Sequence, residues 1–308
     1  MNSQSLHLAL CCDRNVADGL ATTIASVATH LSRDFTLSVH VIDCGLGDEL
    51  RAKLVRMIEQ HLPNSRLGFL ELHMDSLSGF PTPASLSHVT PVTYARLLLH
   101  DLLPDVERVI YLDCDLFVTG DLSEIYLTSL NGSPLAAVQD TVIPTVGHER
   151  ESLVANLPGL RPDEPYFNAG VLLLDLAKLR ELGASALYTR LLRTVEARYA
   201  DQSVLNGAFH SQWKPLPPRW NRQVQLGREF NVFPDVPHAI WHFASKLKPW
   251  HFHRRAARGL LRQWQAQRDA VEWAPSFAPT EQVNSSFMAD LLKEGRSWMQ
   301  CRRSGKLA

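Results

Sequence analysis

The chain has 308 residues, 45% of them hydrophobic, and its 31 basic and 32 acidic side chains leave a formal net charge of −1. A chain of this size and hydrophobic content can bury a substantial core, so one large domain, or one domain with an appendage, is expected. No apolar run approaches the roughly 20 residues that a membrane span requires, and residues 1–5 lack the basic segment and apolar core of a signal peptide, so a cytoplasmic protein is expected.

In its first half the chain alternates short apolar runs with segments whose apolar residues recur at helical spacing. Strands are predicted at residues 6–12, 36–43 and 67–73, and helices at residues 16–31 and 48–61. This alternation is typical of an α/β fold with a largely parallel, doubly wound sheet.

The second half begins with a long loop over residues 79–91, which holds three prolines. Long loops at such a point are often functional. The alternation then continues, with strands predicted at residues 108–112, 135–138, 170–174 and 239–243, and helices at residues 93–103, 176–197 and 202–209.

The cysteines are five in number and have no C-x-x-C spacing. They are Cys11, Cys12, Cys44, Cys114 and Cys301. An odd number with this spacing argues against a disulfide framework or a zinc site, so most are expected to be small buried side chains.

The end of the chain differs from the rest in charge. Residues 246–308 hold twelve Lys or Arg against five Asp or Glu, an excess of seven positive charges in a chain that is otherwise acidic. A helical pattern over residues 253–273 places apolar residues on one side and arginines on the other. The apolar set is Ala257, Leu260, Leu261, Trp264 and Val271, and the basic set is Arg254, Arg255, Arg258, Arg262 and Arg268. Two roles stay open, packing on the main domain with a solvated basic face and binding to an anionic surface, and both can hold together.

The most informative motif is Asp113-Cys-Asp115, which follows the predicted strand at residues 108–112. Residues i and i+2 of a strand share a face, so both carboxylates would face the crevice beyond the strand's carboxyl end, where open α/β sheets bind ligands. A pair of carboxylates there can close on one hard cation. The alternative is that one aspartate starts a turn and the other is a solvated neighbour.

Five further segments carry polar residues out of proportion to their apolar surroundings. They are residues 12–15 (CDRN), 93–96 (TYAR), 167–170 (FNAG), 201–202 (DQ), and 241–243 (WHF) with 246–250 (KLKPW). Together with the aspartate pair, and in this order, they resemble glycosyltransferase family 8, retaining enzymes of the nucleotide-sugar fold termed GT-A. The resemblance implies a catalytic domain over residues 1–252. The helical basic extension over residues 253–308 resembles, more loosely, that of bacterial lipopolysaccharide α-glucosyl- and α-galactosyltransferases.

The resemblance implies that Asp113, Asp115 and His242 hold a divalent cation, and a single imidazole among oxygen ligands suits Mn²⁺ first and Mg²⁺ next. A lone histidine after a strand is more often a satisfied core residue. Lys248, six residues further on, favours a metal-ligand role for His242, because its ammonium group would contact the same diphosphate as a point charge. The implied nucleotide-binding set is Asp13, Asn15, Arg96, Asp113, Cys114, Asp115, Ser245 and Lys248.

Several members of this set have alternatives. Asp13 and Asn15 would hydrogen-bond the uracil and ribose of a UDP-hexose, although either could instead cap the helix that begins near residue 16, a role that suits Asn15 well. Arg96 would be half buried and needs an anion, for which either Asp113 or the diphosphate would serve. Ser245 stands where the family usually has glycine, which would narrow the site or add a hydroxyl.

On the sugar side the resemblance implies roles for Asp140, Asn168, Asp201 and Gln202, with Gln202 nearest the anomeric carbon. Asp140 could instead form a turn, and Asp201 could cap its own helix. Ser203 takes the position after the Asp-Gln pair, where some relatives carry an acid, so a covalent intermediate at that position is excluded. We therefore expect front-face substitution, in which the acceptor hydroxyl attacks from the side of the departing diphosphate.

The expected function is that of a metal-dependent retaining hexosyltransferase, which transfers glucose or galactose from a UDP-sugar to a glycan such as lipopolysaccharide core. A catalytically silent nucleotide-sugar-binding protein is one alternative. A nucleotidyltransferase or phosphohydrolase is another, although it would want further acidic ligands for two metals. The basic tail predicts contact with an anionic membrane surface on its cytoplasmic face, and the near-neutral whole chain argues against nucleic acid.

Overall fold

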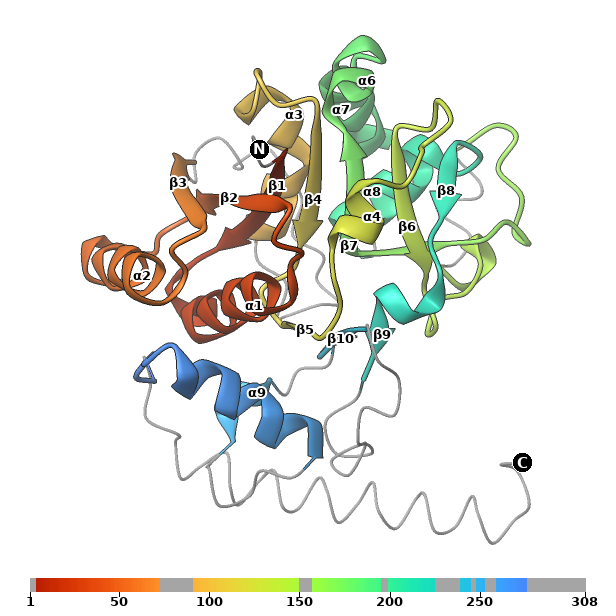
Figure 1. The fold of residues 1–308 in the computed structure, drawn as a ribbon. Helices are drawn as coiled ribbons and strands as arrows, with labels where there is room; N and C mark the ends of the chain where they lie inside the picture. Colours follow the sequence, from red (N-terminus) through yellow and green to blue (C-terminus); the bar gives the residue numbers. More distant parts are fainter. Residues whose placement is uncertain are drawn as a thin grey trace, which may run out of the picture.

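The structure is a computed structural model that describes residues 4–72, 91–149, 157–194, 199–224, 239–244, 248–252 and 259–275. Within these ranges a sheet runs through the molecule with helices on both of its faces (Figure 1). The loop predicted at residues 79–91 falls outside these ranges except for Pro91.

The main sheet has seven strands in the described part of the chain, in the order β3-β2-β1-β4-β7-β6-β8. The strands are β1 (Gln4–Cys12), β2 (Phe35–Asp43), β3 (Ser65–Glu71), β4 (Arg108–Leu112), β6 (Leu135–Gln139), β7 (Phe167–Asp175) and β8 (Trp213–Pro215). Neighbouring strands are parallel, except that β7 is antiparallel to both β4 and β6. The predicted, mainly parallel α/β sheet is therefore confirmed, with one reversed strand that extends the predicted strand 170–174 in both directions.

Helices cover the two faces of this sheet. They are α1 (Ala17–His30), α2 (Asp48–His61), α3 (Leu99–Leu102), α4 (Ser123–Tyr126), α6 (Leu176–Glu181), α7 (Ala184–Thr194), α8 (Asp201–Phe209) and α9 (Gly259–Ala270). On one face α1 and α2 pack with Leu8 and Leu10 of β1. On the other face Ala9 and Cys11 pack with α3, α6, α7 and α8. Both faces of the central strands are buried, which explains why the sequences of these strands are continuous apolar runs.

Two predicted helices differ from the structure. Residues 93–103 form mainly a 3₁₀ helix, η3 (Pro91–Leu98), in which the Arg96 side chain donates to a backbone carbonyl oxygen of its own turn. The single helix predicted at residues 176–197 is wrong, because its described part, residues 176–194, forms α6 and α7, and Gly183 adopts a φ of +64° just after α6.

A second, three-stranded sheet lies at the carboxyl end of β4. Its strands are β5 (Leu116–Val118), β10 (Ile240–His242) and β9 (Arg222–Gln223). β10 is antiparallel to β5 and parallel to β9, with His242 opposite Leu116 on one side and Gln223 on the other. The predicted strand at residues 239–243 is thus confirmed, but it belongs to this small sheet, which carries residue 242 to the aspartate pair.

The helix α9 lies against α1, at the bottom of Figure 1. Its predicted apolar residues Leu260, Leu261 and Trp264 are buried, as is Val271 just beyond the helix. Arg268, predicted on the basic side, is also buried, because it follows Trp264 by four residues on the same stripe. Arg262 is exposed as predicted, while Arg254, Arg255, Ala257 and Arg258 lie outside the described residues.

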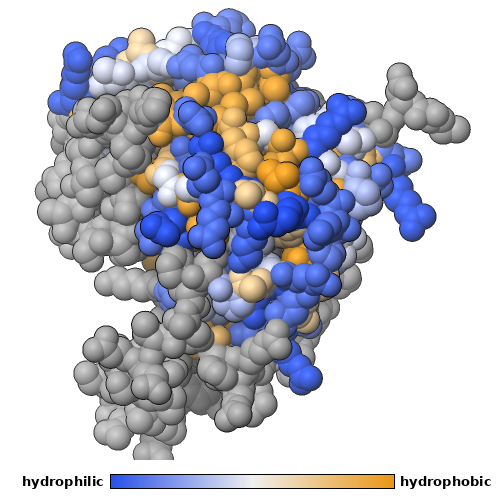
Figure 2. Space-filling model, turned by 90° about the vertical axis from the view of Figure 1, so that its left-hand side faces the viewer, coloured by the Kyte–Doolittle hydropathy of each residue, from blue (hydrophilic) through white to orange (hydrophobic). Residues whose placement is uncertain are grey.

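Figure 2 views the molecule from the side of β3 and α2. Hydrophilic side chains cover much of the described surface there, and apolar ones gather in a strip. β3 is the outermost strand of the sheet, and its residues Leu67, Phe69 and Leu70 are half-buried. No helix of the described ranges is long and apolar enough to cross a membrane.

Four cysteines, Cys11, Cys12, Cys44 and Cys114, are buried free thiols, which confirms the prediction for them. Burial raises the pKa of the Cys12 and Cys114 thiols, so these side chains behave as small hydrophobic groups. Cys301 lies outside the described residues.

Candidate active site

Asp113 and Asp115 lie in the turn between β4 and β5, and β10 brings His242 to the same point. The His242 Nε2 atom is 3.8 Å from Asp113 Oδ2 and 3.4 Å from Asp115 Oδ1. One ligand atom from each of the three side chains lies within 4.8 Å of the others. Two carboxylates and an imidazole in this arrangement can hold one divalent cation.

The orientation of His242 is fixed from behind. Its Nδ1 atom is 2.9 Å from Oδ1 of Asn221, and that amide donates from Nδ2 to Oδ1 of Asn168 at 2.8 Å. An amide oxygen only accepts, so Nδ1 carries a proton, and Nε2 is the nitrogen that faces the carboxylates and that a cation would coordinate.

Gly170 makes this close approach possible. A Cβ atom at this position would lie 2.4 Å from Cε1 of His242 and 2.8 Å from Oδ2 of Asp113. Glycine therefore lets the backbone of β7 pass directly beneath two of the three candidate ligands. The residue belongs to the FNAG segment that the sequence singled out.

Lys248 lies beside the cation site. Its Nζ atom is 2.6 Å from Oδ2 of Asp115 and donates to the carbonyl oxygen of Phe243 at 2.8 Å. Burial alone would raise the pKa of Asp115, but Lys248 and His242 outweigh it and hold this pKa well below its usual range. Asp115 therefore stays ionised, as a metal ligand must.

Arg96 is buried, with 9% of its side chain exposed, and binds two carboxylates: Asp113 at 2.8 Å and Asp201 at 3.0 Å. Its guanidinium also lies 4.5 Å from the centroid of the Tyr111 ring, whose hydroxyl donates to Asp113. Burial would lower the pKa of Arg96, but Asp113 and Asp201 outweigh it and raise the pKa. The prediction that Arg96 needs an anion is confirmed, and Asp113 is one of its two partners.

Asp201 does not cap α8, so that alternative is wrong. The residue at the N-cap position is Ala200, and no side chain caps the helix there. The Asp201 carboxylate instead accepts from Arg96 and from the hydroxyl of Thr93. Burial raises the pKa of Asp201, although Arg96 opposes this shift.

A cavity of about 400 Å³ opens beside the cation site. Its lining includes seven of the eight predicted nucleotide-binding residues, namely Asp13, Asn15, Arg96, Asp113, Cys114, Asp115 and Lys248. The eighth, Ser245, lies outside the described residues. The lining also includes Trp250, whose ring packs against Gly19 of α1 so closely that a Cβ there would lie 2.5 Å from Cζ3.

Asp13 and Asn15 form one local unit at the edge of this cavity. The Asp13 carboxylate accepts from the backbone N–H of Asn15 at 2.9 Å and from its side-chain amide at 3.1 Å. It thereby caps the 3₁₀ helix η1 (Arg14–Val16) that precedes α1. The capping alternative therefore holds for Asp13, which caps this short helix, and is wrong for Asn15.

A second cavity, of about 330 Å³, lies on the other side of the aspartate pair. The four predicted sugar-side residues Asp140, Asn168, Asp201 and Gln202 all line it. Both cavities have Thr93, Arg96, Asp113 and Asp115 in their walls. The predicted nucleotide and sugar regions therefore meet at the cation site.

The Asp140 carboxylate forms the predicted turn and also lies in the wall of the sugar-side cavity. Its Oδ1 accepts from the backbone N–H groups of the turn that follows, at 2.7 and 2.9 Å. Its Oδ2 accepts from the side-chain amides of Asn168, Gln202 and Gln223 at 2.9, 3.2 and 3.1 Å. Three amides thus converge on one carboxylate oxygen in the wall of the sugar-side cavity.

Ser203 faces away from the cavity. It is fully buried, and its hydroxyl donates to the carboxylate of Glu149. The residue after the Asp-Gln pair therefore supports the start of α8 from behind.

The sequence interpretation missed Asn221 and Gln223. They flank Arg222, whose guanidinium points away to the Trp241 ring at 5.5 Å. The signal was available, because two amides at alternate positions share a face just as the aspartate pair does. The strand β9 has only two residues, too few for a periodic pattern.

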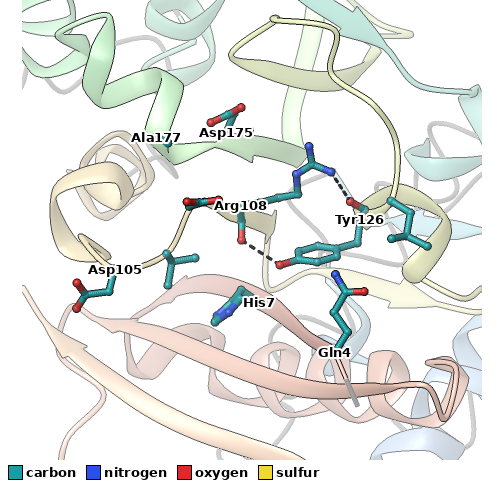
Figure 3. Close-up of a pocket in the computed structure, with 10 residues that line it drawn as sticks. Gln4, His7, Asp105, Arg108, Tyr126, Asp175 and Ala177 are labelled. Atoms are coloured by element: carbon teal, nitrogen blue, oxygen red, sulfur yellow. Dashed lines mark hydrogen bonds between the residues drawn. The ribbon is translucent and has the colours of Figure 1, made fainter. Parts of the chain in front are cut away.

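A larger cavity, of about 580 Å³, lies at the opposite end of β1 and β4 (Figure 3). His7, Arg108 and Tyr126 line it, and none of the predicted site residues that the structure describes does. Arg108 donates to the carbonyl oxygen of Tyr126 at 2.9 Å, and the Tyr126 hydroxyl donates back to that of Arg108 at 3.4 Å. Volume alone therefore does not identify the active site; the converging ionisable groups do.

Comparisons with known proteins agree with this geometry. The family model described as Glycosyl transferase family 8 matches residues 7–254. General stress protein A of Bacillus subtilis is 27% identical over 265 residues, which cover 80% of this chain and 87% of that protein. Lipopolysaccharide 1,2-glucosyltransferase of Escherichia coli K12 is 27% identical over 263 residues, covering 81% and 74% respectively. The galactosyltransferase LgtC, solved in complex with donor and acceptor sugar analogues, is similar with a TM-score of 0.72 and 26% identity over 88% of this chain and 98% of that one.

Proposed function

We propose that this chain, which belongs to glycosyltransferase family 8 and is a glycosyltransferase with the GT-A fold, transfers a hexose from a UDP-sugar to a glycan in a metal-dependent, retaining reaction. The observation that carries the proposal is the meeting of two cavities at Asp113, Asp115 and His242. A leaving diphosphate needs its charge neutralised at that point, between the nucleotide and the sugar.

The residues present fit a divalent cation. Asp113 and Asp115 offer oxygen atoms, and His242 offers Nε2 because Asn221 occupies its other nitrogen. This mixed donor set suits Mn²⁺, with Mg²⁺ as the second choice. A cation bound there would stabilise the negative charge that develops on the leaving diphosphate.

The rest of the donor would extend in both directions from this point. Asp13 and Asn15 would hydrogen-bond the uracil and ribose, and Lys248 would contact the diphosphate as a point charge. Asn168 and Gln202 would bind the sugar on the other side. The proposal is supported by the position of these residues along one continuous wall.

The interactions of the carboxylates that line the sugar-side cavity agree with front-face substitution. Among the described residues they are Asp113, Asp115, Asp140 and Asp201, and each is engaged: the first two form the cation site, Asp140 holds three amides, and Asp201 pairs with Arg96. Double displacement would need a free carboxylate facing the anomeric carbon. We therefore favour direct attack by the acceptor hydroxyl, whose oxygen bonds to the anomeric carbon as the carbon–phosphate-oxygen bond breaks. The hydroxyl proton passes to the departing phosphate oxygen, with Gln202 beside the reacting carbon.

The donor sugar and acceptor follow from the relatives. One acts, by its name, as a lipopolysaccharide glucosyltransferase and another as a galactosyltransferase. Glucose or galactose as donor sugar and a lipopolysaccharide-type glycan as acceptor are the proposal for this chain. The basic excess of residues 246–308 supports peripheral contact with an anionic membrane surface on its cytoplasmic face.

The test is release of UDP from UDP-glucose and UDP-galactose, measured with Mn²⁺, with Mg²⁺ and with a chelator. Asp115→Asn is expected to lower metal-dependent release by about 100-fold or more. Asp105→Asn, at an exposed carboxylate in the distant cavity, is the matched control and should leave release unchanged. Release that is insensitive to the chelator and to Asp115→Asn would refute the proposal, and UDP-sugar binding without any release would favour a silent binding protein.

A further inference from the structure

A chain of hydrogen bonds connects the cation site to the sugar-side cavity through the interior of the protein. It runs from His242 Nδ1 to Asn221 at 2.9 Å, from Asn221 to Asn168 at 2.8 Å, and from Asn168 to Asp140 Oδ2 at 2.9 Å. All four residues are buried, with exposed fractions of 4%, 2%, 8% and 4% in that order. Buried polar chains of this kind act as a unit because water does not compete for their bonds.

The direction of every bond follows from groups whose roles are fixed. The backbone N–H of Gly170 must donate, and it lies 2.9 Å from Oδ1 of Asn168. The Asp140 carboxylate must accept, so Asn168 presents Nδ2 to it. Asn221 then has to offer Nδ2 to Asn168 and Oδ1 to His242, which leaves no freedom for an amide flip.

The donor and acceptor assignment along this chain decides which nitrogen of His242 can bind a metal. Nε2 lies 3.4 Å from Asp115 and 3.8 Å from Asp113, so a proton on Nε2 would be attracted by both carboxylates. Such a tautomer would point an N–H into the place of the cation and remove one ligand. Asn221 opposes it by accepting a hydrogen bond from the Nδ1–H group, which keeps a proton on Nδ1.

We propose that Asn221 is a positioning residue that holds His242 in its metal-binding tautomer and, through Asn168, ties it to the Asp140 side of the sugar cavity. The inference rests on the proposed function, because it needs His242 to be a metal ligand. It adds a residue that no motif of the sequence marked. Hydrogen-bond partners behind a metal-binding histidine raise its basicity and fix its ring, and their loss commonly lowers metal affinity by about 10- to 100-fold.

The first measurement needs no metal. Nitrogen chemical shifts of ¹⁵N-labelled histidine in the wild-type protein, assigned by loss of one signal set in His242→Asn, are expected to place the proton on Nδ1. In Asn221→Leu the proton is expected to move to Nε2. A wild-type protein in which Nδ1 carries no proton would overturn the proposal even if the leucine variant failed to fold.

The second measurement is Mn²⁺ affinity, followed through the electron paramagnetic resonance signal of free Mn²⁺. Asn221→Leu is expected to weaken binding by about 10- to 100-fold. Arg222→Gln, at the next residue of the chain but with its side chain on the Trp241 ring, should bind as the wild type does. Unchanged affinity in a folded Asn221→Leu protein would reject the positioning role, whereas absence of Mn²⁺ binding by the wild type would instead reject the proposed metal site and leave the nitrogen shifts to decide the tautomer.

Discussion

Replacing Gly170 by alanine tests the cation site through a single methyl group. The added Cβ would lie 2.4 Å from Cε1 of His242, whereas ordinary contact begins near 3.4 Å, so the two must separate by 1.0 Å. Metal–ligand distances hold only within about 0.2 Å. The displacement is therefore about five times what coordination tolerates. Since Asp113 Oδ2 would also be only 2.8 Å from the methyl, a second ligand is pushed at the same time.

The assay is Mn²⁺ titration of Gly170→Ala with and without UDP, with circular dichroism as the check of folding. We expect a loss of Mn²⁺ affinity of at least about 10-fold, because one of three protein ligands is displaced. Gly68→Ala is the matched control: it lies in β3 of the same sheet, and its added Cβ would meet nothing nearer than Val39 O at 3.9 Å. A folded Gly170→Ala protein that binds Mn²⁺ like the wild type would show that the three side chains are not the ligands.

Three further predictions concern stability and the buried charges. Trp264→Ala empties a fully buried site beside Trp250, so we expect urea denaturation to report a loss of about 3–5 kcal/mol; a loss below about 1 kcal/mol would mean that α9 is not part of the core. Arg96→Lys removes the planar fork that binds Asp113 and Asp201 together, so UDP release should fall without recovery by the retained charge, and wild-type rates would contradict this. Burial, with His7 as a lesser cause, lowers the pKa of His40 to about 4, so the unfolded chain gains its proton first and stability should decline as the pH falls from about 6.5 to about 4. His40→Gln should flatten that decline in urea midpoints compared at pH 7 and pH 5, and an unchanged slope would exclude His40 as its source.

The parts of the site that sequence could predict are those with local order. Asp113 and Asp115 were found because alternate residues of a strand end share a face. His242, far along the chain, was found only through the family resemblance, since nothing in residues 239–243 says which strand they join. Asn221 was not found, because its role arises when a two-residue strand pairs beside β10 and no local pattern encodes that pairing.

Two helix predictions were wrong because one local signal was given more weight than another. Gly183 was visible in the sequence and marks the end of α6 by its positive φ, yet the apolar spacing on both sides of it suggested one continuous helix. The sequence interpretation placed Arg268 on the exposed basic side of the helix. Arg268 lies four residues after Trp264, however, and this spacing places it on the buried side. The charge of Arg268 predicts exposure, whereas its position in the helical repeat predicts burial. Burial is observed, because the long arginine side chain can lie over the Trp264 ring.

The charges of the site explain why a cation belongs to the proposed function. Three carboxylates, those of Asp113, Asp115 and Asp201, face two cationic side chains, Arg96 and Lys248. The formal sum of these five groups around the cation site is −1 before any substrate enters, and both cationic groups are already paired. A diphosphate with two negative charges would then meet net repulsion in a partly buried cavity, where charges are screened weakly. A divalent cation between the aspartates reverses that sign, so metal binding would be a condition for donor binding as well as for departure of the diphosphate.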